Sequence, residues 1–213
     1  MSKNNDAALQ ILAQTVLVRE AAGLSALVDS VGPSVVRVAR TVVDTPGKII
    51  TTGSGTSGIM AARLAHLLSV CGTPALYLAA TDALHGGMGA VDGDDLVVAI
   101  SKTGLSSELT ELVTRLVSRK VRVVAVTEDA GSPFAAAATD VAELPPTIPD
   151  ADPGGMIALA STLAVGAWGD AVAVVAMALN GHTIHDVVRS HPAGGVGTRE
   201  DLIDDDNRPV VVL

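Results

Sequence analysis

The chain has 213 residues, of which 48% are hydrophobic but only 1% aromatic, and its formal net charge is −9. This length suits one α/β domain with a core of Val, Ala, Leu and Ile, and the acidic charge without a basic cluster argues against nucleic acid as a partner. The single cysteine, Cys71, excludes a disulfide framework, and its apolar surroundings predict a place in the core.

The first 45 residues are expected to form a helical arm. Apolar residues recur at steps of three and four between Leu9 and Val31, which predicts an amphipathic helix, and Pro33 is expected to end it and to begin a second one. Such an arm serves either contacts between subunits or the capping of a sheet. Because the first ten residues are polar, we expect no signal peptide and a cytoplasmic protein.

Residues 46–197 are expected to form an α/β core. Short apolar runs rich in β-branched residues predict five strands, at 48–52, 75–79, 96–101, 121–127 and 141–144. Helices are predicted at 57–71, 106–120, 132–139 and 154–180. The last is very apolar, but Asp170 interrupts it and Gly and Ala are frequent, so we interpret it as a buried helix and not as a membrane span.

The alternation of strands and helices predicts a three-layer sandwich around a parallel sheet with the strand order 2-1-3-4-5. No second domain is visible in the sequence. Residues 198–213 combine a run of aspartates with an apolar tip and are expected to form either a solvated tail or a docking strand.

Two loops have the composition of phosphate-binding loops. The segments KIITTGSGTSG (48–58) and LVVAISKTGLSSE (96–108) each read as a buried strand, a Gly/Ser/Thr loop and the first turn of a helix. Such loops offer backbone N–H groups and hydroxyls to an anion. The first and third strands are neighbours in the predicted order, so both loops face one crevice. The pattern, which has no P-loop lysine, predicts a phosphorylated small molecule that is not a nucleoside triphosphate.

A dinucleotide site is the alternative for the first loop, because GSGTSG fits the G-x-G-x-x-G fingerprint. That site needs an acidic residue at the end of the second strand, where Asp82 comes a few residues late, and it gives the second loop no role. We therefore expect no cofactor. His182 and His185 have a spacing that suits a metal, but no carboxylate or cysteine cluster accompanies them, so helix-capping roles at the surface are favoured over a metal site.

Four segments resemble a known family. ISKTGLSSE resembles the I-S-x-S-G-x-[ST]-x-E loop of sugar isomerase (SIS) domains, and GSGTSG resembles their first loop; ALHGGMGAV and SHPAGGVG resemble segments of the arabinose-5-phosphate isomerase branch. The resemblance runs from about residue 47 to residue 197. It implies a flavodoxin-like fold, a sugar-phosphate ligand, and aldose–ketose isomerisation through an enediol. It also implies a homodimer or homotetramer, in which a histidine of one subunit often completes a neighbour's site. The pair of cystathionine-synthase-type regulatory modules that usually follows in that branch is not expected within these 213 residues.

The resemblance assigns roles to individual residues. Its phosphate-binding positions correspond to Ser54, Ser57, Ser101, Thr103 and Ser106. Lys102 is absent from the usual loop; it either adds a positive charge near the phosphate or is a solvated loop residue. His191, in SHPAGGVG, is implied to act on the sugar ring or its oxygens. His85 matches the histidine of the other segment, with a capping or core role as its alternative.

Two departures from the family pattern concern the chemistry itself. The branch carries a lysine where this chain has Thr56 and a glutamate where it has Leu105. A third carboxylate of the family aligns with Asp150, which becomes the candidate base, with Asp152 as the fallback. Either aspartate could instead cap the 154–180 helix, and Asp152 before a proline fits that role better. The leading hypothesis is a phosphosugar isomerase; the alternative is a non-catalytic sugar-phosphate sensor that keeps the phosphate loops.

Overall fold

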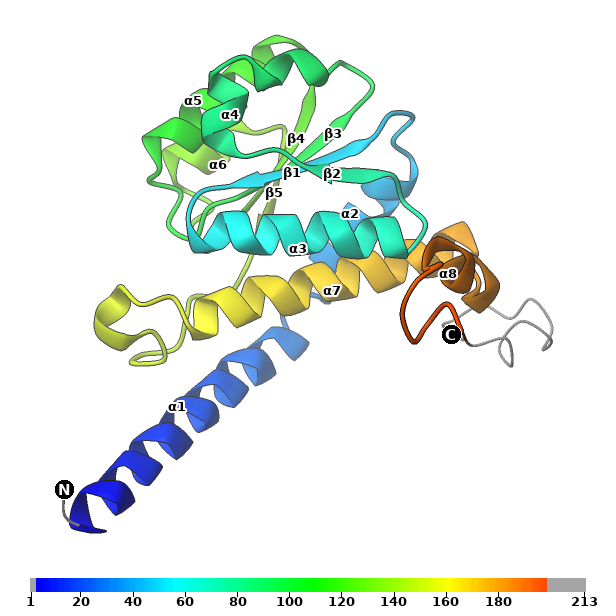
Figure 1. The fold of residues 1–213 in the computed structure, drawn as a ribbon. Coiled ribbons are helices and arrows are strands. Elements are labelled where there is room, and N and C mark those ends of the chain that lie inside the picture. Colours follow the sequence, from blue (N-terminus) through cyan, green and yellow to red (C-terminus); the bar gives the residue numbers. More distant parts are fainter. Residues whose placement is uncertain (1–2, 199–213) are drawn as a thin grey trace.

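A fully parallel sheet of five strands forms the middle layer of the fold (Figure 1). The computed structural model describes residues 3–198, and the strand order is β2-β1-β3-β4-β5. Each strand lies within two residues of its predicted place: β1 Ile49–Gly53, β2 Ala75–Tyr77, β3 Leu96–Ile100, β4 Arg122–Thr127 and β5 Asp140–Glu143. The predicted three-layer α/β fold and its topology are therefore confirmed.

Helices cover both faces of the sheet, as the continuous apolar strands require. In β3, Leu96 and Val98 belong to one buried cluster while Val97 and Ala99 belong to the other. One face is covered by α2, α3 and α7, and the other by α4, α5 and α6 (Figure 1). Their bounds are α2 Gly32–Val43, α3 Thr56–Val70, α4 Ala80–Leu84, α5 Ser107–Ser118, α6 Pro133–Ala137 and α7 Ala160–Asn180; the 3-10 turn η1, Gly87–Ala90, follows α4.

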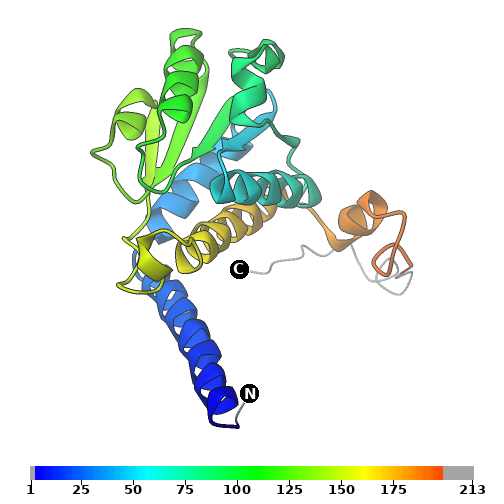
Figure 2. The ribbon, with the colours of Figure 1, turned by 60° about the vertical axis from the view of Figure 1, so that its left-hand side comes forward.

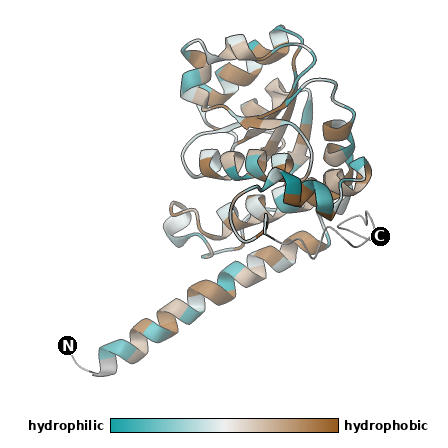
Figure 3. Cartoon of the chain, turned by 45° about the vertical axis from the view of Figure 1, so that its right-hand side comes forward, coloured by the Kyte–Doolittle hydropathy of each residue, from teal (hydrophilic) through white to brown (hydrophobic). Residues whose placement is uncertain are grey.

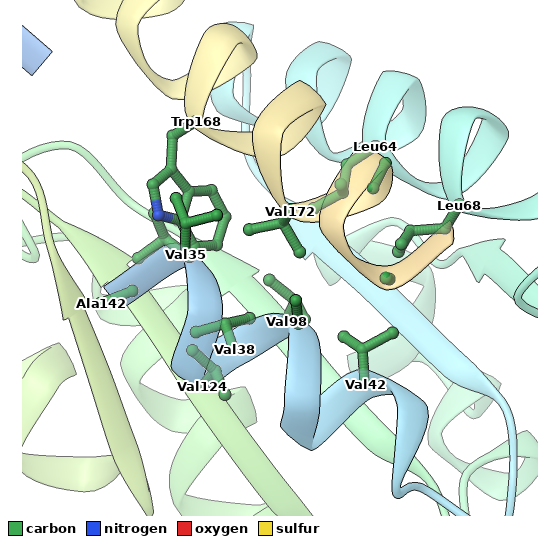
Figure 4. Packing of buried hydrophobic residues seen from close by; sticks show 14 of the residues in the cluster. Val35, Val38, Val42, Leu64, Leu68, Val98, Val124, Ala142, Trp168 and Val172 are labelled. Carbon is green, nitrogen blue, oxygen red and sulfur yellow. The ribbon is translucent and has the colours of Figure 1, made fainter. Parts of the chain in front are cut away.

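Small aliphatic side chains build the larger core, as the low aromatic content predicts. Figure 4 shows Trp168 of α7 beside Val35 of α2, with Val98 of the sheet below them. Trp168 is 1% exposed, and its indole N–H donates to the Ser34 hydroxyl at 3.3 Å. Cys71 is buried in the same cluster, which confirms its predicted place in the core.

The predicted start of the long helix at residue 154 is wrong, because α7 begins at Ala160. Gly154 and Gly155 have φ angles of 63° and 67°, in the left-handed region that glycine adopts readily. The backbone therefore makes only the single 3-10 turn η2, Pro153–Gly155, before an irregular segment leads into the helix. Asp152 reaches across this segment to accept hydrogen bonds from the amides of Leu159 and Ser161.

The first helix, α1 (Lys3–Val28), projects away from the domain (Figures 1 and 2). Its last turns pack on the domain through Leu24 and Leu27, whereas apolar side chains further out, such as Leu12 and Leu17, are 60% and 64% exposed (Figure 3). By length and composition alone, residues 5–28 and α7 could each cross a membrane, a test that core helices of soluble proteins also pass. About a third of α7's apolar window is buried inside the domain, against 6% of that of α1.

The last described element is α8, Ile184–Ser190, which the sequence analysis did not predict. Gly181 ends α7 in the left-handed conformation, and Thr183 and Asp186 form a capping box at the start of α8. The predicted capping roles of His182 and His185 are thus wrong, since other side chains form the caps. Apart from residue 198, the predicted tail at 198–213 lies outside the described residues.

Candidate functional site

A cleft opens at the carboxyl edge of the sheet, where β1, β3 and β4 end beside the first turns of α3 and α7. This is the edge where the strand order reverses, which is where open α/β sheets bind their ligands. The walls are apolar, with Met60, Ile100, Val126, Leu144 and Val165 among them. Four segments contribute polar residues to this lining: Thr56, Ser57, Lys102, Thr127, Glu128, Ser161 and Thr162.

The first loop brings a helix N-terminus to the cleft. Gly55 has a φ of 58° and turns the chain out of β1, so that α3 begins at Thr56. The N–H groups of Thr56 and Ser57 stand in the first turn, where a helix offers no acceptor, and the positive end of the helix dipole lies with them. Ser57 lines the cleft as predicted. The carbonyl of Ser54 accepts the Gly58 amide at 3.3 Å, which places Ser54 one turn back.

The second loop, residues 101–106, runs from β3 to α5. The Ser106 hydroxyl caps α5 by accepting the Leu109 amide at 3.4 Å, and Thr103 accepts the Leu105 amide at the same distance. Ser101 is 6% exposed, behind the loop surface. None of these three predicted phosphate ligands is among the residues that line the cleft, whereas Lys102 of the same loop lines it.

Lys102 is ion-paired and remains partly exposed. Its ammonium lies 2.6 Å from Asp152 Oδ2, and the Asp152 side chain is 4% exposed. The Ser161 hydroxyl donates to the same oxygen, while Oδ1 accepts from the Leu159 and Ser161 amides at 2.9 and 3.2 Å.

Burial opposes ionisation of Asp152, but the hydrogen bonds from Lys102 and Ser161 outweigh it and lower the pKa of Asp152 to about 2. A carboxylate that is so acidic and fully hydrogen-bonded is a poor proton acceptor near neutral pH. Asp152 is therefore unsuited to its fallback role as the base. It stabilises the start of α7 instead, in line with the capping alternative.

Glu128 is a carboxylate of the cleft that the sequence analysis missed. It follows β4 directly and is half-buried, and it accepts hydrogen bonds from the Thr147 amide at 3.1 Å and from the Thr147 hydroxyl. The carbonyl of Lys102 accepts the Glu128 amide at 2.9 Å, which joins the ends of β3 and β4. Its place right after a parallel strand is a sequence signal that could have identified it.

Asp150 and His85 lie outside the set of residues that lines the cleft. Asp150 is exposed, with a left-handed φ of 61°, and its carbonyl accepts a hydrogen bond from Arg19 of α1 at 3.0 Å. His85 is exposed at the C-terminal end of α4. The structure of one chain does not bring either side chain to Ser57 and Lys102.

His191 also lies away from the cleft. It ends α8, beyond the C-terminal end of α7, whereas the cleft lies at the start of α7 (Figure 1). The 21 residues of α7 correspond to about 30 Å of helix. Nδ1 of His191 lies 2.7 Å from the Val187 carbonyl, which can only accept, so this contact leaves Nε2 as the acceptor of a neutral ring.

Comparisons with known proteins agree with the fold. Residues 44–174 match the model of the SIS domain. The chain is 33% identical over 195 residues to the arabinose 5-phosphate isomerase GutQ of Salmonella typhi, covering 92% of this chain and 60% of that protein. It is 35% identical over 153 residues to the arabinose 5-phosphate isomerase KdsD of Escherichia coli K12, covering 72% and 46%.

Among solved structures, the E. coli CFT073 protein c3406, in complex with arabinose 5-phosphate, superposes with a TM-score of 0.83 at 28% identity. That match covers 90% of this chain and all of the other. The chain spans about 60% of the length of the GutQ protein that it matches.

Proposed function

The chain belongs to the SIS domain family, and we propose that it is a phosphosugar isomerase, which interconverts an aldose phosphate and a ketose phosphate through an enediol. The observation that carries the proposal is the cleft at the strand-order reversal, with a helix N-terminus and a hydroxyl-rich loop on neighbouring strands. The similarity to GutQ and KdsD makes arabinose 5-phosphate the first substrate to test.

The phosphate is proposed to bind between the first turns of α3 and α5. Thr56 and Ser57 contribute amides at the positive end of α3, and the two loops contribute the hydroxyls. Local donors are needed because the chain has a net charge of −9 and Glu128 adds a carboxylate to the cleft. The proposed hydroxyl ligands are Ser54, Ser57, Ser101, Thr103 and Ser106.

The Ser101→Ala/Thr103→Ala double variant tests this phosphate site. It should weaken arabinose 5-phosphate binding by about 1–3 kcal/mol, the usual loss for hydrogen bonds to a charged group. Ser118→Ala, which removes an exposed hydroxyl at the other end of α5, is the matched control. Equal affinity of the double variant and the wild type in calorimetry would reject this binding mode. Neither nicotinamide dinucleotide should bind at sub-millimolar concentration in the same assay.

For the proton transfer, Asp150 is the proposed base, with His191 acting on the sugar oxygens and His85 as a further candidate. Asp150→Asn should slow exchange of the C2 proton with deuterated water by about 10²–10⁴-fold, with a much smaller change in affinity. Glu128→Gln is the competing variant, because Glu128 already lines the cleft. If only Glu128→Gln abolishes exchange, the base is Glu128. If the wild type binds phosphosugars without any exchange, the chain is a sensor.

A homodimer or homotetramer is part of the proposal. Such an assembly would cover the exposed apolar side chains of α1. It would also allow His191 to reach the cleft of a neighbouring subunit, because within one chain the length of α7, about 30 Å, separates His191 from the cleft. Leu12→Glu/Leu17→Glu should dissociate the assembly in light scattering, whereas Gln14→Glu, an exposed polar position of the same helix, should not. A wild type that is monomeric at assay concentration would contradict this part. A cytoplasmic location without membrane binding completes the proposal.

A further inference from the structure

Two side chains from different parts of the cleft share one buried carboxylate. Lys102 comes from the loop after β3 and Ser161 from the first turn of α7, and both donate to Oδ2 of Asp152. Asp152 lies behind them, 4% exposed, and does not itself line the cleft. The three residues thus form a fixed unit on the α7 side of the cleft.

The hydrogen atoms of this unit determine what it can offer to a ligand. The Lys102 ammonium has three donors and uses one for Asp152, its partner among the described residues, so two remain. Ser161, which lines the cleft, has one hydroxyl hydrogen and gives it to Asp152, so its oxygen can act toward a ligand only as an acceptor. Lys102 is therefore suited to a carbonyl or anionic oxygen, and Ser161 to a sugar hydroxyl.

The unit lies at the start of α7. Asp152 also accepts the amides of Leu159 and Ser161, so the Lys102 ammonium is held against the start of α7. The phosphate, by contrast, is proposed to lie at the first turns of α3 and α5. A ligand with its phosphate there presents its other end to Lys102.

We propose that Lys102 determines specificity by donating to the oxygen at C1 of the sugar phosphate, with Asp152 as the residue that positions it and Ser161 as acceptor for an adjacent hydroxyl. The proposal rests on the proposed sugar-phosphate site. A lysine side chain is flexible, and its pairing with Asp152 fixes the ammonium before the ligand binds. A donor fixed in this way also stabilises the negative charge that an enediolate develops on that oxygen.

Two ligands that differ only at C1 test the role of Lys102. They are 5-phospho-D-arabinonate, with a carboxylate at C1, and D-arabinitol 5-phosphate, with a hydroxyl there. Lys102→Met should weaken arabinonate binding by about 10–100-fold, the loss of a charge-assisted hydrogen bond, and arabinitol binding by less than about threefold. Equal losses for both would make Lys102 a phosphate ligand, and no loss for either would remove it from the site; both results overturn the proposal.

Asp152→Asn tests the positioning role. In the wild-type background it should lower the arabinonate-to-arabinitol preference by about 5–10-fold, and in the Lys102→Met background by less than about twofold, because Asp152 acts through Lys102. An equal effect in both backgrounds would overturn the positioning role. The preference is a ratio of two affinities, so partial unfolding of a variant cancels. Lys48→Met, which breaks a similar buried pair elsewhere, is the matched control and should leave the preference unchanged.

These measurements do not need turnover. If the wild type binds both ligands with the Lys102-dependent preference but exchanges no C2 proton, the isomerase proposal fails and the role of Lys102 stands. If the wild type exchanges the C2 proton of a phosphosugar but binds neither ligand, the isomerase proposal stands and the role of Lys102 fails.

Discussion

The two edges of the sheet carry nearly the same ion pair in different surroundings. Lys102–Asp152 at the carboxyl edge and Lys48–Asp95 at the amino edge both have a nitrogen–oxygen distance of 2.6 Å. In both, the aspartate side chain is almost buried, at 4% and 2%, and the lysine is about a third exposed, at 30% and 33%. The chemistry of the pair alone therefore does not distinguish a ligand site from a structural one.

The surroundings make the difference. Asp95 accepts the amides of Lys48 and Asp92 at 2.9 and 3.0 Å, so it fastens the turn before β3 to the start of β1. A hollow beside that edge is lined by residues at the C-terminal ends of α2, α3 and α7, among them Thr73 and Asn180. Helix C-termini present carbonyl oxygens and the negative end of the dipole, which disfavours a phosphate. At the carboxyl edge the first turns of helices present N–H groups, which favours one.

Removing one aspartate from either pair should give the largest effect on stability. Asp95→Ala leaves Lys48 and two backbone amides without their acceptor and should lower the free energy of unfolding by about 3 kcal/mol. The affinity of the folded fraction for D-arabinitol 5-phosphate should stay the same. Urea unfolding and calorimetry measure the two quantities, and a change in affinity would show that the amino edge contributes to binding.

Acid should have a smaller effect on the free energy of unfolding, through the carboxylate of Asp152. The pKa of Asp152 is about 2, below the value near 3.9 of an unfolded chain, so the unfolded state binds more protons in this range. The stability from this depression is present above about pH 4 and is lost as the pH falls toward 2; it amounts to about 2–3 kcal/mol. The difference in unfolding free energy between the wild type and Asp152→Asn should therefore shrink as the pH is lowered from about 5 to about 2. Asp95 is present in both proteins, so its own lowered pKa cancels. A constant difference would contradict the depressed pKa.

The smallest expected effect concerns the cap of α5 at the carboxyl edge. Ser106→Ala removes the acceptor of the Leu109 amide and should cost about 1 kcal/mol of stability. Ser107→Ala, at the next and exposed position, should cost much less. If Ser106 also binds the phosphate, the difference between the two variants should grow when arabinose 5-phosphate is added. A difference that is the same with and without ligand would restrict Ser106 to the cap.

The sequence predicted the sheet well because its signals are local. The strands are apolar runs bounded by turn residues, and the two Gly/Ser/Thr loops follow β1 and β3. The start of α7 was misplaced because apolar composition continues through 156–159, while the backbone at Gly154 and Gly155 is left-handed.

The candidate site was only partly predictable from the sequence. Ser57 and Lys102 were identified by their loops, but the partner of Lys102 is 50 residues away and becomes visible only after folding. Glu128 was missed because it belongs to no recognised motif. Asp150, His85 and His191 came from the family resemblance, and no local signal in the sequence indicates whether their side chains come together.

The central claim is that a sugar phosphate binds at the carboxyl edge of the sheet and not at the amino edge. Amide chemical shifts of the ¹⁵N-labelled chain, titrated with arabinose 5-phosphate, test it directly. We expect the largest changes at residues 54–57, 101–106 and 159–162, with residues near Lys48 and Asp95 unaffected. Changes centred on Lys48, Asp95 and Thr73 would contradict the claim.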